Sequence, residues 1–160
     1  MTKDHLLQAI ITALTLDLAV LSTAAREAHE AATNEECQPD NKYDTTALEA
    51  SYVAQGQANR AQEIRAALES YRTLKLSAFD DDTPIRLTAL ITLENQEGIE
   101  RRFFLGPQGG GTKISDEDGE IVVITPGSPL GRGLLGLRSG DEVQTGVAGR
   151  ATSFTIVAVR

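Results

Sequence analysis

The sequence predicts an α+β fold, in which an N-terminal antiparallel coiled-coil helical hairpin precedes a small sheet domain. Two long stretches carry apolar residues at alternating steps of three and four, which is the spacing of a coiled-coil seam. A segment with Pro, Asp and Asn separates them, and short β-rich segments follow residue 84. We therefore divide the chain into a hairpin over 1–76, a linker over 77–83 and an α+β domain over 84–160.

The first seam lies within residues 3–36, which contain neither Pro nor Gly, and comprises Leu7, Ile11, Leu14, Leu18, Leu21, Ala25, Ala28 and Ala32. The second comprises Ala47, Ala50, Ala54, Gln57, Ala61, Ile64, Leu68 and Tyr71. Folding the seams back on each other pairs Leu14 with Leu68 and puts the tip near Asn41, within 37–45. Because the seam consists mostly of Ala near the tip, and small residues bury little apolar area, the base should carry most of the stability. A hairpin that merely dimerises is the alternative.

Composition restricts the partners and the compartment. The net charge of −8 makes free duplex nucleic acid a poor partner, and the absence of Trp argues against base stacking. Cys37 is the only cysteine, and His5 and His29 are far apart, so neither a disulfide nor a Cys/His zinc set is expected. The apolar run 6–21 contains Asp17 and is shorter than the roughly 20 residues of a membrane span. We therefore expect a cytoplasmic protein with no membrane segment.

The second half of the chain is predicted to form strands and one short helix. The β-rich segments are 85–93, 100–105, 120–125, 143–147 and 152–159. Ser128 and Pro129 can cap and start a helix through Leu135, which Gly136 can end. The loop of three glycines at 109–111 could cradle a phosphate, but it lacks the Lys-Ser/Thr of a P-loop, so we expect no P-loop there.

One segment has the pattern of a known family. Residues 128–136 read Ser-Pro-Leu-Gly-Arg-Gly-Leu-Leu-Gly, and residues 140–143 read Gly-Asp-Glu-Val. This resembles the C-terminal signature of the Gre transcript-cleavage factors, Ser-Pro-Leu-Gly-Arg-Ala-Leu-Leu-Gly followed by Gly-Asp-Glu-Val. The resemblance implies an FKBP-like C-terminal domain that docks on the rim of the RNA polymerase secondary channel. The docking candidates are Ser128, Pro129, Leu130, Gly131 and Arg132, although a capped helix explains most of them as structure.

The resemblance also implies a function. The chain would be a monomeric transcription elongation factor, not itself an enzyme, whose hairpin enters the channel and stimulates cleavage of backtracked nascent RNA by the polymerase. It would bind no cofactor alone and would share Mg²⁺ with the polymerase active site, since a two-metal site needs additional carboxylates. The candidates to be lent for catalysis and metal binding are Asp40 and Asp44. Further tip contacts would be Glu35, Glu36, Asn41, Lys42, Tyr43 and Glu49.

The tip departs from the family pattern, which is Asp-Leu-Ser-Glu-Asn-Ala-Glu-Tyr. Aligning its Tyr with Tyr52 leaves Thr45 and Leu48 at the positions of the Asp and the first Glu. The acids of this tip are therefore displaced. This departure keeps open a second hypothesis, a secondary-channel regulator without cleavage activity.

Two further alternatives follow from the residues. Asp44 can simply cap the second helix, and Thr46 with Glu49 fits a capping box. A prolyl isomerase or chaperone activity would need a pocket lined with aromatic rings. Phe103 and Phe104 are adjacent on a predicted strand and so point to opposite faces, which argues against such a pocket.

Overall fold

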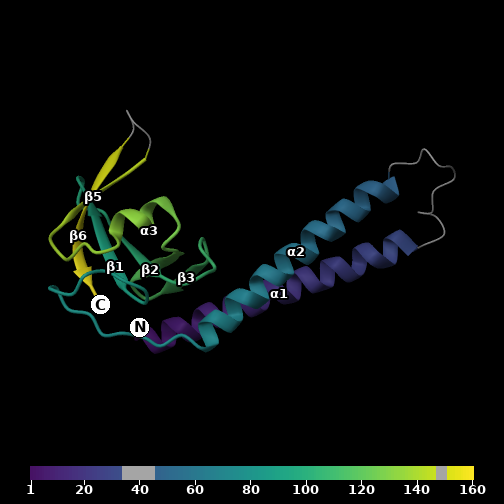
Figure 1. Ribbon diagram of the computed structural model, residues 1–160, viewed down its shortest axis with the longest axis horizontal. Helices are drawn as coiled ribbons and strands as arrows, with labels where there is room; N and C mark the ends of the chain where they lie inside the picture. The colour runs from purple at the N-terminus through teal and green to yellow at the C-terminus, as the bar shows by residue number, and fades with distance from the viewer. Residues whose placement is uncertain (34–45, 147–150) are drawn as a thin grey trace. The chain divides into compact units, whose positions relative to one another are not determined.

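The computed structural model describes residues 1–33, 46–146 and 151–160, and it confirms the predicted α+β class (Figure 1). Helix α1, Lys3–Thr33, and helix α2, Thr46–Arg72, precede a mixed sheet of six strands within the described residues. The chain forms two compact units. One is Leu14–Glu69, and the other joins Met1–Ala13 to Ser70–Arg160. The first turns of α1 and the last residues of α2 thus belong to the sheet unit, and the predicted boundaries at 76 and 84 stay a prediction.

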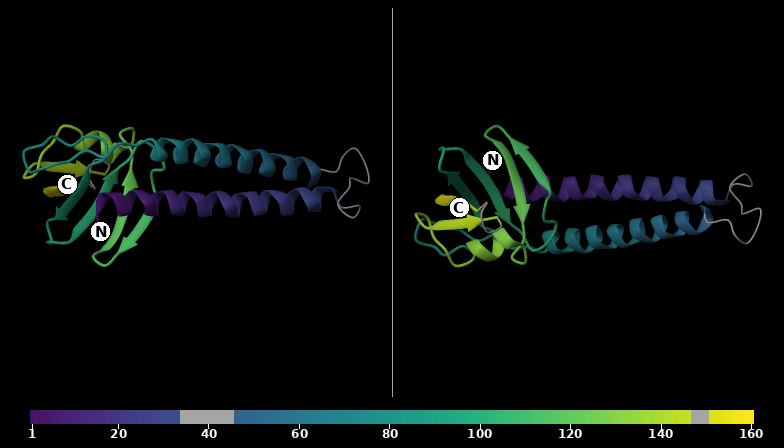
Figure 2. Two further views of the ribbon diagram at one scale, coloured as in Figure 1. Left: turned by 90° about the horizontal axis from the view of Figure 1, so that it is seen from below. Right: turned by 90° about the horizontal axis from the view of Figure 1, so that it is seen from above.

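In the unit Leu14–Glu69, α1 and α2 lie side by side and run in opposite directions (Figures 1 and 2). The chain reverses direction between Thr33 and Thr46, the stretch in which the sequence predicted the tip. Residues 34–45 themselves lie outside the described part. The predicted seam pair Leu14 and Leu68 is buried on both helices, which confirms the antiparallel hairpin.

Burial along the hairpin decreases with distance from its base. On α2 the buried side chains are Ala61, Ile64, Ala67, Leu68 and Tyr71. Farther from the base, the predicted seam residue Gln57 is half-buried and Ala54 is exposed. On α1, the seam residues after Leu14 are half-buried: Leu18, Leu21, Ala25 and Ala28. Among the described residues, the fully buried side chains of the hairpin thus lie near its base, which agrees with the expectation that the base carries most of the stability.

Helix α1 is unusually apolar for a helix with so much exposed surface. Over Lys3–Ala31 it is long and apolar enough to cross a membrane by length and composition alone. Core helices and signal sequences have the same properties, so this feature is weak support for a membrane span. The prediction that the chain has no membrane segment stays a prediction.

The predicted seam is wrong in phase at the first turns of α1. Leu6 and Ile10 are fully buried, whereas the predicted Leu7 and Ile11 are only half-buried. The buried face is thus rotated by one residue, which is about 100° on a helix. These turns belong to the compact unit that contains the sheet, so α2 is not the only element that determines their buried face.

The sheet has the strand order β3-β4-β2-β1-β6-β5. Strands β2 and β4 are parallel, and the other neighbours are antiparallel. Four predicted strands are confirmed within two residues at each described end, whereas β3 was not predicted. The bounds are Leu90–Asn95 for β1, Glu100–Leu105 for β2, Lys113–Asp116 for β3, Gly119–Ile124 for β4, Glu142–Thr145 for β5 and Thr152–Val159 for β6.

The first predicted strand, 85–93, begins too early, because β1 starts only at Leu90. Thr88 has a φ of 76°, which a β-branched residue rarely adopts, and the chain turns there. Two hydrogen bonds hold this conformation. The Thr88 amide donates to the Leu105 carbonyl at 2.8 Å, and the Thr88 hydroxyl accepts from the Ser77 amide at 2.9 Å. An alternating apolar pattern does not reveal such a turn.

Helix α3, Pro129–Leu134, packs on one face of the sheet, where Leu134 is completely buried (Figure 1). The residues of this core include Ile91, Leu93, Leu105, Ile124, Val143, Ile156 and Val159. Phe103 packs at its margin, while Phe104 is fully buried on the opposite face of β2. The two rings therefore do not line one pocket, as the sequence predicted.

Candidate functional site

Most predicted tip residues lie outside the described residues. They are Glu35, Glu36, Asp40, Asn41, Lys42, Tyr43 and Asp44. Glu49 is described, and it is exposed in the first turn of α2. An acid at this end of a helix interacts favourably with the positive end of the helix dipole, so Glu49 has a structural role whatever else it contacts. The capping box with Thr46 stays a prediction.

The described beginning of α2 presents apolar and aromatic side chains to solvent. Leu48 is 55% exposed, Tyr52 is 70% exposed and Val53 is 57% exposed. Leu48 and Tyr52 are four residues apart and therefore share one face of the helix. When the Gre tip pattern is aligned with its tyrosine on Tyr52, the exposed Leu48 stands at the position of the first glutamate of that pattern. Sequence reasoning identified this substitution but not the exposed apolar surface that it creates.

Residues 1–33, 46–146 and 151–160 contain no group of three or more His, Cys, Asp and Glu side chains that could hold a metal ion. Carboxylate oxygens are the protein ligands that Mg²⁺ prefers. The carboxylates proposed for Mg²⁺, those of Asp40 and Asp44, lie outside these ranges, so the ligand set stays a prediction.

The segment predicted to dock is built around the start of α3. The Ser128 hydroxyl accepts a hydrogen bond from the Gly131 amide at 3.1 Å and donates one to the Thr125 carbonyl at 2.7 Å. Pro129 follows at the first helical position, which confirms the predicted cap. Gly131 is buried, and a Cβ atom there would lie 1.9 Å from the Thr125 carbonyl oxygen. Ser128 and Gly131 therefore have structural roles in this segment.

Only part of this segment is available to a partner. Leu130 is half-buried against the core, while Pro129 and Arg132 are exposed. Leu135, at the C-terminal cap of α3, is 41% exposed, although its neighbour Leu134 is completely buried. The accessible docking candidates are therefore Pro129 and Arg132, to which the structure adds Leu135. Helical periodicity could have identified Leu135, because 134 and 135 face different directions.

The second part of the signature forms a turn between α3 and β5. Gly140 has a φ of 93°, and the Asp141 carboxylate accepts a hydrogen bond from the Arg138 amide at 2.8 Å. The Asp141 carbonyl accepts from the Ile156 amide, so the turn is joined to β6. Val143 follows as a core residue. These contacts explain Gly140, Asp141 and Val143 as structure.

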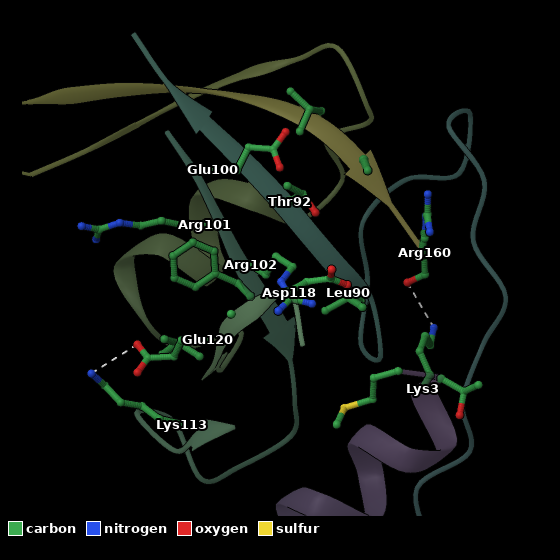
Figure 3. A pocket seen from close by; sticks show the side chains of 17 residues that line it. Lys3, Leu90, Thr92, Glu100, Arg101, Arg102, Lys113, Asp118, Glu120 and Arg160 are labelled. Carbon is green, nitrogen blue, oxygen red and sulfur yellow. Dashed lines mark hydrogen bonds and ion pairs between the residues drawn. The ribbon is translucent and has the colours of Figure 1, made fainter. Parts of the chain in front are cut away.

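A groove of about 1200 Å³ lies beside the sheet in the unit formed by Met1–Ala13 and Ser70–Arg160 (Figure 3). Arg102 donates two hydrogen bonds to Asp116, one of 2.8 Å from Nη1 to Oδ2, and this guanidinium lowers the pKa of Asp116 to about 2. Basic and acidic side chains both line the groove, so it lacks the single charge sign that would select a polyanion. They are Lys3, Arg101, Arg102, Lys113 and Arg160, with Glu100, Asp118 and Glu120.

No protein-family profile and no curated protein sequence matches this chain. Among solved structures, it is similar to Gfh1 of Thermus aquaticus, with 21% identity, 96% of this chain and 95% of that chain covered, and a TM-score of 0.39. It is also similar to GreA factor homolog 1 (Gfh1) of Thermus thermophilus, with 20% identity, 95% of each chain covered and a TM-score of 0.38. The prokaryotic transcription elongation factor GreA/GreB from Nitrosomonas europaea is similar at 15% identity over 70% of this chain and 91% of that chain, with a TM-score of 0.37.

Proposed function

We propose that this chain is a cytoplasmic, monomeric accessory factor that binds RNA polymerase and inserts its hairpin tip into the secondary channel during transcription elongation. The observation that carries the proposal is the reversal of the chain between Thr33 and Thr46. It leaves the acidic segment 34–45 as the connection between two long antiparallel helices. The sequence signature at 128–143 supports the same reading, because in the Gre factors a hairpin precedes a domain with this segment.

The dimensions of the helices fit a probe. Helix α1 has 31 residues, which corresponds to about 46 Å at 1.5 Å per residue. The distal seam consists of alanines such as Ala25 and Ala28, and small residues let helices approach closely. A pair of this kind is narrow, which suits insertion into a channel.

In the first of two candidate functions, the chain stimulates cleavage of backtracked RNA. Bound Mg²⁺ would supply charge stabilisation for the attacking and leaving oxygens of the phosphodiester. The contribution of this chain would be carboxylate oxygens from Asp40 and Asp44, which would help to hold the ion and orient the attacking water. The polymerase would supply the remaining ligands, so the chain alone would catalyse nothing.

In the second candidate function, the chain binds the polymerase but does not stimulate RNA cleavage. It is favoured by Leu48, whose exposed side chain occupies a position where the aligned family motif has an acid. A leucine cannot bind Mg²⁺ or orient water. In this case the hairpin would regulate initiation, pausing or substrate access by occupying the channel.

One assay distinguishes the two candidates. Purified chain is added to stalled, backtracked elongation complexes with Mg²⁺, and short 3′ RNA fragments are quantified alongside binding to the polymerase. Cleavage stimulation predicts fragments that decrease at least tenfold with Asp40→Ala or Asp44→Ala but not with Asp17→Ala, which removes an exposed acid elsewhere on α1. Binding without fragments supports the second candidate. Failure to bind polymerase would refute both.

A gain-of-function variant tests the alignment of the Gre tip pattern with its tyrosine on Tyr52. If the missing acid explains a lack of cleavage, Thr45→Asp with Leu48→Glu should produce fragments. Thr45→Asp with Val53→Glu is the matched control, because Val53 is exposed to a similar degree on the same helix. Equal fragment yields from the two double variants would contradict the alignment on Tyr52.

The docking surface is tested separately. Arg132→Ala and Leu135→Ala remove exposed side chains near the end of α3 and should each weaken binding to polymerase by about tenfold, as removal of an interface anchor typically does. Arg72→Ala, at the exposed end of α2, is the control. Unchanged affinity in both docking variants would exclude this face of α3 from the interface.

A further inference from the structure

One face of the first half of α2 carries a row of exposed, uncharged side chains. Leu48, Tyr52, Gln55 and Asn59 follow one another at steps of four, three and four residues, which places them on the same side of the helix. The Gln55 side-chain amide donates a hydrogen bond of 2.9 Å to the Asn59 side-chain oxygen, so these two residues are paired with each other. The apolar part of the row is therefore Leu48 and Tyr52, which we call the Leu48–Tyr52 face.

The hairpin does not use this apolar surface for its own packing. The side chains of α2 that are buried in the hairpin lie at other positions, beginning with the half-buried Gln57 and the buried Ala61. Leu48 and Tyr52 are both more than half exposed. Removal of either side chain would therefore leave the buried contacts of the hairpin intact.

The arrangement of the two side chains is that of a helix that binds in a groove. A single exposed apolar residue is common on a protein surface. Here, however, a leucine and a tyrosine lie one helical turn apart, and large apolar side chains at i and i+4 are the anchors with which helices dock into apolar grooves. A tyrosine suits such a contact, because its ring buries a large area while its hydroxyl can stay hydrated.

The charges around the Leu48–Tyr52 face argue against nucleic acid as its partner. Glu49 is exposed directly beside Leu48, and the first basic residue of α2 is Arg60, which is paired with Glu63 at 3.2 Å. The connecting segment 34–45 contributes four acids and one lysine. A base stacked on Tyr52 would bring its phosphates toward these acids, and residues 46–59 contain no Lys or Arg to hold them.

We propose that the Leu48–Tyr52 face docks into an apolar groove of the polymerase protein that is bordered by basic side chains. The inference rests on the proposed function for the identity of the partner, and it adds the contact that holds the hairpin after insertion. Leu48 and Tyr52 would be buried in the groove, and Glu49 would face its basic border, so the two surfaces would be complementary in polarity and in charge. Apolar burial, without any contribution from metal binding, would then retain the hairpin.

The contact is tested by measuring the affinity of the full chain for RNA polymerase that is free of nucleic acid. Tyr52→Ala and Leu48→Ala should each weaken binding at least tenfold, because each removes one of the two anchors. Tyr52→Phe keeps the ring and should change the affinity by less than about threefold. Val53→Ala is the matched control and should have no effect, because Val53 is exposed to a similar degree but lies about 100° around the helix from Tyr52.

The outcomes separate this inference from the proposed function. If the wild-type chain binds polymerase and neither alanine variant binds more weakly, the docking face is wrong while the proposed function stands. A loss that appears only with elongation complexes containing RNA would assign the contact to nucleic acid and would also overturn the inference, as would an equal loss with Val53→Ala. Failure of the wild-type chain to bind polymerase would overturn both. Protection of the Ile64 amide from hydrogen exchange shows that each variant hairpin is folded.

Salt dependence provides a second measurement. Apolar burial is not screened by salt, so the factor by which Tyr52→Ala weakens binding should be the same at low and at high salt. The wild-type affinity itself should fall with salt, because the acids beside this face would contact basic side chains. A Tyr52→Ala effect that disappears at high salt would show that the contact is electrostatic and would contradict the proposal.

Discussion

Replacement of Gly131 by alanine should destabilise the sheet unit, although alanine is normally the better helix former. Gly131 lies in α3, and its added Cβ atom would approach the Thr125 carbonyl oxygen to 1.9 Å and the Ser128 hydroxyl to 2.9 Å. The first of these neighbours is main chain and cannot rotate away. The same carbonyl accepts hydrogen bonds from the Ser128 amide and hydroxyl, so its displacement would also disturb the cap.

The magnitude follows from three contributions. Overpacking of a tight site typically costs about 1–3 kcal/mol, with the backbone contact here favouring the upper end. Disturbance of a serine cap costs about 1 kcal/mol. Glycine-to-alanine replacement in a helix restores about 1 kcal/mol through reduced conformational entropy. We therefore expect Gly131→Ala to lower the free energy of unfolding by about 3 kcal/mol.

The neighbouring Gly133 provides the control. A Cβ atom there would lie 3.2 Å from Cγ2 of Val143, a side-chain atom, and alanine is the residue that the Gre signature has at this position. Gly133→Ala should therefore leave the free energy of unfolding unchanged or raise it by about 0.5 kcal/mol. Hydrogen exchange of the Ile91 and Ile156 amides, in two interior strands of the sheet, measures both values. A loss below about 1 kcal/mol for Gly131→Ala, or equal losses in the two variants, would refute the packing argument.

Three further predictions concern other contacts. The Gln57 side-chain oxygen is buried without a hydrogen-bond partner among the described residues, so Gln57→Leu should stabilise the hairpin by about 1 kcal/mol in urea unfolding. Tyr71 donates a hydrogen bond of 2.6 Å to the Gln108 carbonyl, and Tyr71→Phe should cost about 1 kcal/mol. Because burial raises the pKa of Tyr71, the wild-type chain should also lose stability as the pH rises above about 10, whereas the variant should not show this contribution. The lowered pKa of Asp116 predicts that its pairing with Arg102 stabilises the fold above about pH 4 and is lost as the pH falls toward 2, a dependence of the melting temperature that Asp116→Asn should remove.

The sequence was sufficient for features that depend on local periodicity. The hairpin follows from two seams whose residues pair in antiparallel order, and Leu14 and Leu68 are both buried, as that pairing requires. The start of α3 follows from Ser128 and Pro129, because a serine cap and a proline at the first turn act through contacts within four residues. Strand β2 follows from a β-rich run bounded by turn residues.

Features that depend on distant contacts could not be predicted in this way. The turn at Thr88 exists because Ser77 and Leu105 supply its hydrogen-bond partners, and neither is close in sequence. Likewise, burial of Leu6 and Ile10 in place of the predicted seam positions occurs where α1 joins the sheet unit. A coiled-coil pattern contains only the contacts between the two helices.

The residues of the candidate site also differ in whether the sequence could predict their roles. In the docking segment, the sequence could assign Ser128 a structural role, because a serine followed by proline caps a helix, whereas the exposure of Arg132 comes from the structure. The Arg102–Asp116 pair connects β2 with β3, although β4 lies between these two strands, and the sequence analysis did not predict β3. The hydrogen bond from the Lys3 side chain to the Arg160 main chain joins residues 157 positions apart, and no motif indicates it.

In the hairpin, the buried side chains that stabilise the fold are not the exposed side chains that lie near the proposed tip. From Leu48 to Arg60, the described side chains of α2 are exposed except for the half-buried Gln57. Truncation of the buried Ile64 to alanine should cost about 2–5 kcal/mol, whereas substitutions at exposed positions usually change stability by less than about 0.5 kcal/mol. Substitutions at Leu48 or Tyr52 therefore alter the surface near the tip without reducing the stability of the base. Any change in polymerase binding or RNA cleavage that they produce can be attributed to that surface, because the hairpin that presents it stays folded.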